Sequence, residues 1–415
     1  MILKFLKNNK IVFFNIPFLF YLLLILAFFL NLDPNGGAYL DYLNQKRISQ
    51  EFSQNFFFEF LNFDKETTRH SPVLLIILSL FEKINLPDVY IRLINVHFCL
   101  LLPFLVYKII TLQFNFIKKT DAILLACLIF LSPTFISLSI WPDSRIHGLI
   151  FFCLSIINYI NFKKNNNSKY AIRCIIWYAI ASYFSLNYAL FSLFFMYKFF
   201  NFYKLDIKFL FLIGLNFILA CPALIYVFSL ESIFFFKSGV ADKEFDLIQS
   251  LNFSNKILMI SSIIMFYIIP FYFSKLFQFN WIKFDNLIIS LIIFFICVTF
   301  FNYSGNYSGG GIFFKISHFF IGNNILFYFF SIVSLIVIIE LIKINFDNFI
   351  IIFLLILSNV QFSIYHKYYD PFLFILLFSI LDIKLNVIKM NNIKMSYFYT
   401  FSSIFLILNF IKQII

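Results

Sequence analysis

Close to the N-terminus the chain reads "IVFFNIPFLFYLLLILAFFLNL", Ile11 to Leu32, and this run decides the fold class. It is longer than the roughly 7–15 apolar residues of a secretory signal, and no small-residue cleavage site follows it. About 20 apolar residues in a helix are enough to cross the hydrocarbon core of a bilayer. The run therefore predicts an uncleaved first transmembrane helix, with the basic segment "MILKFLKNNK" on the cytoplasmic side.

Similar apolar runs recur along the whole chain of 415 residues. Hydrophobic residues make up 62% of the sequence and charged residues 13%, which excludes an ordinary soluble fold. The pattern predicts an all-α polytopic membrane protein with about 13 transmembrane helices, in a range of about 11–13. We expect a single transmembrane domain over residues 1–415 and no separate soluble domain.

The basic residues are distributed as in a membrane protein. The net charge is +12, and Lys and Arg recur in alternate loops, which is the pattern that holds loops in the cytoplasm. This distribution argues against nucleic acid as a partner. The six cysteines lie in apolar segments without CxxC spacing, and the five histidines show no paired spacing, so no metal site is predicted. No cofactor is predicted, and a divalent cation is left open as an option.

The first polar loop, residues 33–88, stands apart from the other loops by its length. It is too long for a structureless connection, and alternation of sides places it outside the membrane. Its segment "GGAYLDYLNQKRISQEF", Gly36 to Phe52, has apolar residues at helical spacing with polar residues between them. The loop is therefore predicted to contain short helices that lie in the membrane interface, on the periplasmic side.

Three short motifs carry a family resemblance. They are "DYLNQKRISQEF", which begins at Asp41; "HSPVL", His70 to Leu74; and "HKYYDP", His366 to Pro371. Their order after the first span resembles the GT-C superfamily of membrane glycosyltransferases, which includes protein O-mannosyltransferases and aminoarabinose transferases. The sequence departs from the family pattern where Tyr42 replaces a second acid and Ser71 replaces a proline; the late arginine is also absent.

The resemblance implies a glycosyltransferase of the bacterial cell envelope. Such an enzyme transfers a hexosyl or pentosyl group from a polyprenyl-phosphate-linked donor to a lipid, glycan or protein acceptor. It works at the periplasmic face of the inner membrane, in contact with membrane lipids. Asp41 is the candidate general base, and Asp33 competes with it, although "DPNGG" also fits a simple turn. The candidates for binding the substrate or its phosphate are Arg69, His70, Asp143, Arg145, His366, Lys367 and Tyr369.

Several alternatives remain open at this point. Asp143 and Arg145 lie in the short loop "WPDSRIH", where they either form a local ion pair of small energetic value or contact a substrate. Lys and Arg at helix ends also extend to the interface without any further role. The alternative functions are an envelope polysaccharide polymerase or ligase, and a transporter or flippase for a lipid-linked substrate.

Overall fold

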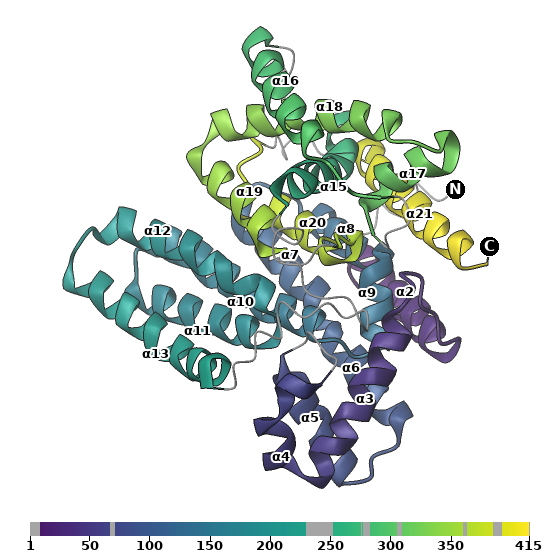
Figure 1. Ribbon diagram of the computed structural model, residues 1–415, viewed down its shortest axis with the longest axis vertical. Helices are drawn as coiled ribbons and strands as arrows, with labels where there is room; N and C mark the ends of the chain where they lie inside the picture. The colour runs from purple at the N-terminus through teal and green to yellow at the C-terminus, as the bar shows by residue number, and fades with distance from the viewer. Residues whose placement is uncertain are drawn as a thin grey trace. The chain divides into compact units, whose positions relative to one another are not determined.

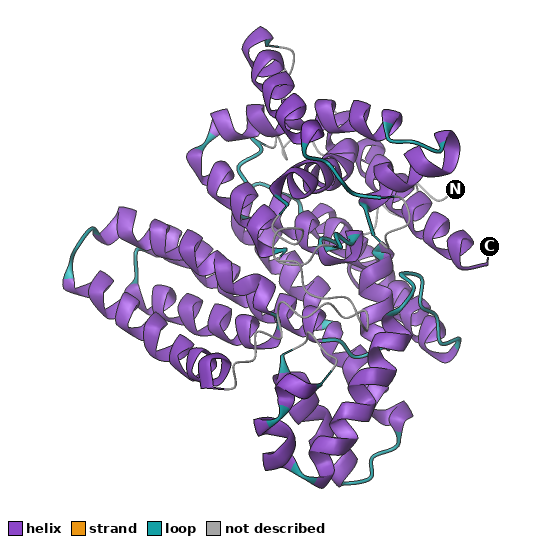
Figure 2. Cartoon of the chain, viewed as in Figure 1, coloured by secondary structure: helices purple, strands orange, loops and turns teal. Residues whose placement is uncertain are grey.

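The computed structural model describes residues 9–66, 71–229, 252–274, 276, 283–304, 309–359, 363–384 and 392–414. Within these ranges the protein is built from helices and connecting loops alone, and no strand occurs (Figure 2). The predicted all-α class is therefore confirmed. The chain forms two compact units, Met1–Phe234 with Val387–Ile415 and Phe235–Asn386, and each is described by itself.

The first unit contains the sequence up to residue 229 and the C-terminal helix. Its α-helices are α2 (Asn9–Phe29), α3 (Ala38–Gln54), α4 (Phe56–Leu61), α5 (Pro72–Lys83), α6 (Asp88–Cys99), α7 (Leu101–Gln113), α8 (Lys119–Cys127), α9 (Pro133–Ile140), α10 (Ser144–Asn165), α11 (Ser168–Phe184), α12 (Ser192–Tyr203), α13 (Ile207–Ser229) and α21 (Asn392–Ile414). Short 3₁₀ helices η1 (Phe63–Lys65), η2 (Leu128–Leu131) and η3 (Leu186–Phe191) join some of them.

Helices in this unit pack both against their neighbours in sequence and against helices further along the chain. The helices α10, α11, α12 and α13 lie side by side, while α3 packs on α5 and α6 packs on α9 (Figure 1). Phenylalanine fills much of the interior; Phe152, Phe191 and Phe195 are fully buried, and Phe152 contacts the other two. The large apolar content of the sequence is thus used both in the helix contacts and on the outer surface.

Proline and small polar residues set the helix starts that shape the site. Pro133 occupies the first turn of α9, and the Ser132 hydroxyl accepts the Phe135 N–H at 2.9 Å. Because proline lacks the N–H that would continue the preceding helix, the chain bends by 67° between residues 119–131 and 133–140. Asp143 starts α10 by accepting the Arg145 N–H at 2.8 Å. The two caps place Trp141 and Asp143 at a sharp corner of the chain.

The second unit is formed by α15 (Phe253–Phe273), α16 (Phe284–Thr299), α17 (Gly311–Ile321), α18 (Ile325–Ile344), α19 (Phe346–Ser358), the 3₁₀ helix η4 (His366–Tyr368) and α20 (Phe372–Leu377). Most of α15 is buried, and α16, α17, α18, α19 and α20 all contact it. Gly310 and Gly311 have φ angles of 90° and 73°, which only glycine adopts easily, and they let α17 begin directly after a tight turn.

Five helices are long and apolar enough to cross a membrane, or six if the bent pair over residues 119–140 counts as one span. Four shorter apolar helices accompany them among the described residues. These helices indicate an integral membrane protein. The expectation of about 13 spans goes beyond what the described helices support by length and composition. The difference arises in part because apolar segments that the sequence predicts as spans form helices of 10–17 residues, such as Phe284–Thr299 and Phe346–Leu357.

Candidate functional site

The first polar loop folds into α3, α4 and α5, which confirms the prediction of short helices in residues 33–88. One face of α3 is buried at Tyr42, Ile48 and Phe52, and the helix packs on α5. The predicted short helix after Ser71 is α5, in which Pro72 takes the first turn. The position of these helices along a membrane surface stays a prediction.

Asp33 organises the start of α3. Its two carboxylate oxygens accept the backbone N–H groups of Gly36 at 3.2 Å and Tyr39 at 3.1 Å. Gly36 and Gly37 have φ angles of 72° and 91°, so the turn between Asp33 and the helix requires glycine. A carboxylate that accepts N–H groups at a helix start stabilises the helix by hydrogen bonding and by its interaction with the helix dipole. The turn interpretation of Asp33 thus has direct support.

Asp41, Asp143 and Arg145 come together in the first unit, and Arg145 forms with Asp143 the local ion pair that the sequence left open. Nη2 of Arg145 lies 2.6 Å from Oδ2 of Asp143 and 3.3 Å from Oδ2 of Asp41. Nε of Arg145 donates a further hydrogen bond of 2.8 Å to Asp143. Asp143 is buried, and its two carboxylate oxygens accept from Nε and Nη2 of Arg145 in a bidentate contact. Asp41 is partly exposed on α3 and contacts Nη2 of the same guanidinium.

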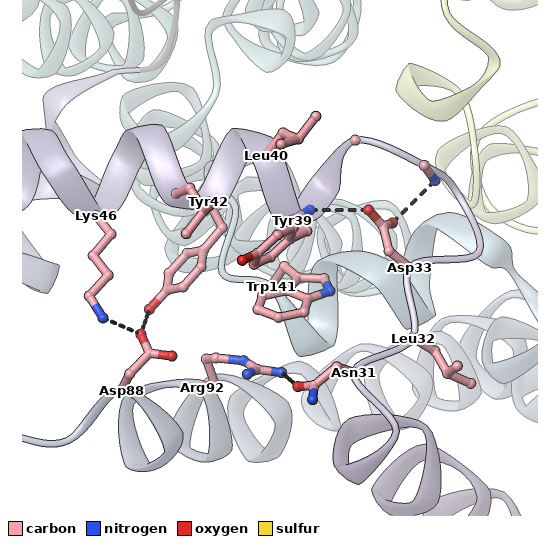
Figure 3. A pocket seen from close by; sticks show the side chains of 13 residues that line it. Asn31, Leu32, Asp33, Tyr39, Leu40, Tyr42, Lys46, Asp88, Arg92 and Trp141 are labelled. Atoms are coloured by element: carbon pink, nitrogen blue, oxygen red, sulfur yellow. Dashed lines mark hydrogen bonds and ion pairs between the residues drawn. The ribbon is translucent and has the colours of Figure 1, made fainter. Parts of the chain in front are cut away.

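A pocket of about 740 Å³ opens beside α3. It lies between α3 and the N-terminal half of α6, with Trp141 at its back (Figure 3). The lining residues are Asn31, Leu32, Asp33, Gly36, Gly37, Tyr39, Leu40, Tyr42, Leu43, Lys46, Asp88, Arg92 and Trp141. Asp33 is the member of this lining that sequence reasoning named as a site residue. Asp41 lies between two lining residues in sequence, Leu40 and Tyr42.

Arg92 lies at the bottom of this pocket as seen in Figure 3, and it is 7% exposed. Its Nη2 donates to Oδ1 of Asn31 at 2.7 Å, and its Nε donates to the backbone oxygen of Ile140 at 3.2 Å. The guanidinium carbon stacks 3.7 Å from the ring centroid of Trp141 and 5.1 Å from that of Phe28. Arg92 thus joins α2, α6 and the α9–α10 corner through contacts with aromatic rings and neutral acceptors.

The end of the pocket away from Asp33 contains a polar triad formed by Tyr42, Lys46 and Asp88 (Figure 3). Oδ1 of Asp88 accepts a hydrogen bond of 2.6 Å from the Tyr42 hydroxyl and one of 3.0 Å from Nζ of Lys46 (Figure 3). Burial, and then the hydrogen bond to Asp88, raises the pKa of Tyr42 far above its ordinary value. Tyr42 therefore stays protonated and acts as a hydrogen-bond donor at all physiological pH values.

One of the late predicted residues, His366, belongs to a polar cluster in the second unit. The Tyr267 hydroxyl donates to Oδ1 of Asp370 at 2.8 Å and lies 3.1 Å from Nε2 of His366. Burial, followed by the positive charge of Lys315, lowers the pKa of His366 to about 3, so its imidazole is neutral at pH 7. Tyr369 is buried next to this cluster in sequence.

Lys367 follows His366 in η4, and its Nζ lies 5.3 Å from the ring centroid of Tyr365. A shared site of the late residues with Asp41 stays a prediction. Arg69 and His70, which the sequence assigns to phosphate binding, lie outside the described residues.

Three glutamates of the first loop also gather. The ligand atoms of Glu51, Glu59 and Glu66 lie within 4.8 Å of one another. Arg47 forms ion pairs with two of them, at 2.6 Å from Glu51 and 2.8 Å from Glu66. The group is therefore partly compensated by one arginine, and exposed acidic groups of this kind are common without a metal.

Sequence reasoning did not assign Tyr39, Tyr42, Lys46, Asp88, Arg92 or Trp141 to the site. A detectable signal did exist for Arg92, because a charged residue in an apolar helix needs a partner inside the protein. Comparison of the chain with protein-family models, characterised proteins and solved structures finds no match. The interpretation of the site therefore depends on its geometry and on the motif resemblance alone.

Proposed function

We propose that this protein is a membrane glycosyltransferase that moves a sugar from a polyprenyl-phosphate-linked donor to an acceptor at the outer face of the membrane. The observation that carries the proposal is the Asp41 carboxylate, which Arg145 contacts at one oxygen and which stands on α3, the helix whose residues Tyr39, Tyr42 and Lys46 line a pocket of about 740 Å³. A transferase of this kind needs a carboxylate to take the acceptor proton and a cavity for the reacting groups.

The edges of the pocket support a lipid-linked substrate. Leu40 is 67% exposed and Leu43 is also exposed, yet both line a cavity that contains Asp33, Lys46 and Asp88. An amphiphile with a polar head and a hydrocarbon tail matches this combination, because the tail can leave along exposed leucines while the head stays among polar groups. α3 has the same two-sided character along its length.

In the proposed mechanism Asp41 is the general base. It accepts the proton of the acceptor hydroxyl as that oxygen attacks the anomeric carbon, and the bond to the phosphate oxygen breaks. Arg145 orients Asp41 and is itself fixed by the buried Asp143. Arg145, the cation beside Asp41 and a sequence candidate for phosphate binding, stabilises the departing phosphate.

The test compares two aspartate variants in cells. Asp41→Asn keeps the size of the side chain but removes its basicity, so transfer should fall by about 100-fold or more. Asp33→Asn serves as the matched control, because an amide oxygen can still accept one of the two N–H groups at the start of α3. The readout is the envelope glycan and lipid-linked sugar profile with and without the protein, with membrane abundance measured in parallel.

The outcomes separate the candidate roles. Loss of a specific sugar with Asp41→Asn and its retention with Asp33→Asn supports the proposal. The reverse result transfers the role of base to Asp33. Full activity of both variants overturns the mechanism. A protein whose loss alters only the distribution of an intact lipid-linked sugar between the two membrane faces is instead a transporter or flippase.

A further inference from the structure

We infer that the pocket between α3 and α6 binds the uncharged ring of a sugar, and that it selects against sugars with an ionised group. The inference rests on the proposed function, which it extends by naming the substrate class. Its basis is the chemistry of the lining residues, which combines balanced charges with an exposed aromatic surface.

The charges of the pocket cancel. The lining contains two carboxylates, Asp33 and Asp88, and two cations, Lys46 and Arg92. Lys46 and Asp88 form an ion pair of 3.0 Å, and Asp33 is used by backbone N–H groups at the start of α3. An ionised ligand would enter this cavity without a net opposite charge and would lose its hydration, which is unfavourable. A neutral ligand incurs no such cost.

The polar groups of the pocket nevertheless offer hydrogen bonds of both kinds. Carboxylate oxygens accept from hydroxyl groups, and ammonium and guanidinium groups donate to them. Trp141 adds a buried indole N–H for which the described residues provide no hydrogen-bond partner. This nitrogen lies on the side of the ring that faces Leu32 and Asp33, both of which line the pocket (Figure 3). A ligand rich in hydroxyl groups matches this mixture of donors and acceptors.

Tyr39 supplies a stacking surface. It is 44% exposed, it lines the pocket, and its ring centroid lies 4.7 Å from that of Trp141 at an angle of 57°. The face of an aromatic ring carries partial negative charge and attracts the partly positive C–H groups on one face of a sugar ring. Tyr39 projects from α3 into the space in front of Trp141 (Figure 3). A pyranose or furanose ring can therefore rest on Tyr39 while its hydroxyl groups reach the polar residues.

The experiment measures binding without turnover. The full-length protein in detergent carries Trp177→Phe and Trp281→Phe, so that Trp141 alone reports on the pocket. Its fluorescence is titrated with methyl glucoside, galactoside, mannoside, xyloside and N-acetylglucosaminide, and with methyl glucosaminide and methyl glucuronide as the charged comparators. We expect at least one neutral glycoside to change the Trp141 signal saturably. We also expect both charged sugars to bind at least about tenfold more weakly than methyl glucoside or the best neutral glycoside.

Variants locate the binding. Tyr39→Ala should weaken the best neutral glycoside about tenfold, and Tyr39→Phe should bind it normally because the ring is retained. Tyr90→Ala is the matched control, since Tyr90 is an exposed tyrosine on α6 that does not line the pocket. The inference is overturned if no neutral glycoside binds, if a charged comparator binds equally well, or if Tyr39→Ala and Tyr90→Ala behave alike.

Two further arms complete the design. The first arm adds undecaprenyl phosphate that carries the sugar of the tightest-binding neutral glycoside. This lipid displaces the glycoside if the pocket holds the donor sugar, and it leaves the glycoside bound if the pocket holds the acceptor sugar. Either result supports a sugar site. Asp41→Asn should bind the glycoside normally. If the protein binds the glycoside but Asp41→Asn cells transfer sugar normally, the catalytic proposal alone is wrong. If the protein does not bind the glycoside but Asp41→Asn cells lose sugar transfer, the sugar-pocket inference alone is wrong.

Discussion

Arg92 should stabilise the first unit more than any exposed ion pair in it, and Arg92→Ala tests this. The variant removes two hydrogen bonds from a charged donor, to Asn31 and Ile140, each with a net value of about 1.5–3 kcal/mol. It also removes the stacking contact with Trp141 at 3.7 Å, which contributes about 2 kcal/mol when desolvated. Because such contributions overlap, we expect a total loss of about 3–5 kcal/mol in the free energy of unfolding.

Arg47→Ala is the matched control on α3. Arg47 forms ion pairs with both Glu51 and Glu66, but its side chain is 49% exposed, so its loss should cost only about 0–1 kcal/mol. The assay is the thermal midpoint of the whole protein in detergent, where Arg92→Ala should fall by several degrees and Arg47→Ala by little. A ranking of the two variants by the number of ion pairs removed predicts the larger loss of stability for Arg47→Ala. Equal shifts for the two variants would refute the argument that burial and stacking outweigh surface pairing.

Further predictions concern orientation, packing and pH. A cysteine placed at Lys46 should react with an impermeant reagent from outside the cell and one at Lys164 only after permeabilisation; the reverse pattern would invert the proposed topology. Asn95→Leu should cost about 2 kcal/mol by leaving two carbonyl groups of the α9 segment without their amide donor, as measured by the same thermal midpoint. Burial, then the charges of Glu51 and Glu66, raises the pKa of Glu59, so its ionisation opposes folding. Glu59→Gln should therefore be more stable than the parent above the raised pKa, with the difference vanishing below about pH 4; a constant difference across this range would exclude the effect.

The fold class and the helices of the first loop could be predicted because they depend on local patterns. Apolar runs of membrane-spanning length identify buried and lipid-facing helices, and the spacing of apolar residues in Gly36–Phe52 gives α3. Span counting was less successful because an apolar run does not show where a helix bends. The bend at Ser132 and Pro133 divides one such run.

The ion pair of Asp41 with Arg145 could be anticipated in part, since Asp41 lies in the long first loop and Arg145 in a short loop assigned to the same membrane face. The pocket could not, because its walls come from segments far apart in sequence. Tyr39, Arg92 and Trp141 meet only after the turn at Asp33, the start of α6 and the corner before α10 have formed. No local sequence pattern predicts that these three side chains lie close together.

Tyr42 shows how a three-dimensional arrangement can change the meaning of a motif. In the linear pattern Tyr42 is a departure, because it stands where the related motif has a second acid. In the structure its hydroxyl donates to Asp88 at 2.6 Å, so a carboxylate reaches this part of the pocket from the start of α6. Lys46, one turn along α3, contacts the same oxygen at 3.0 Å. A comparison of motifs by position therefore records only the departure at Tyr42, whereas the folded chain places the carboxylate of Asp88 beside the Tyr42 hydroxyl.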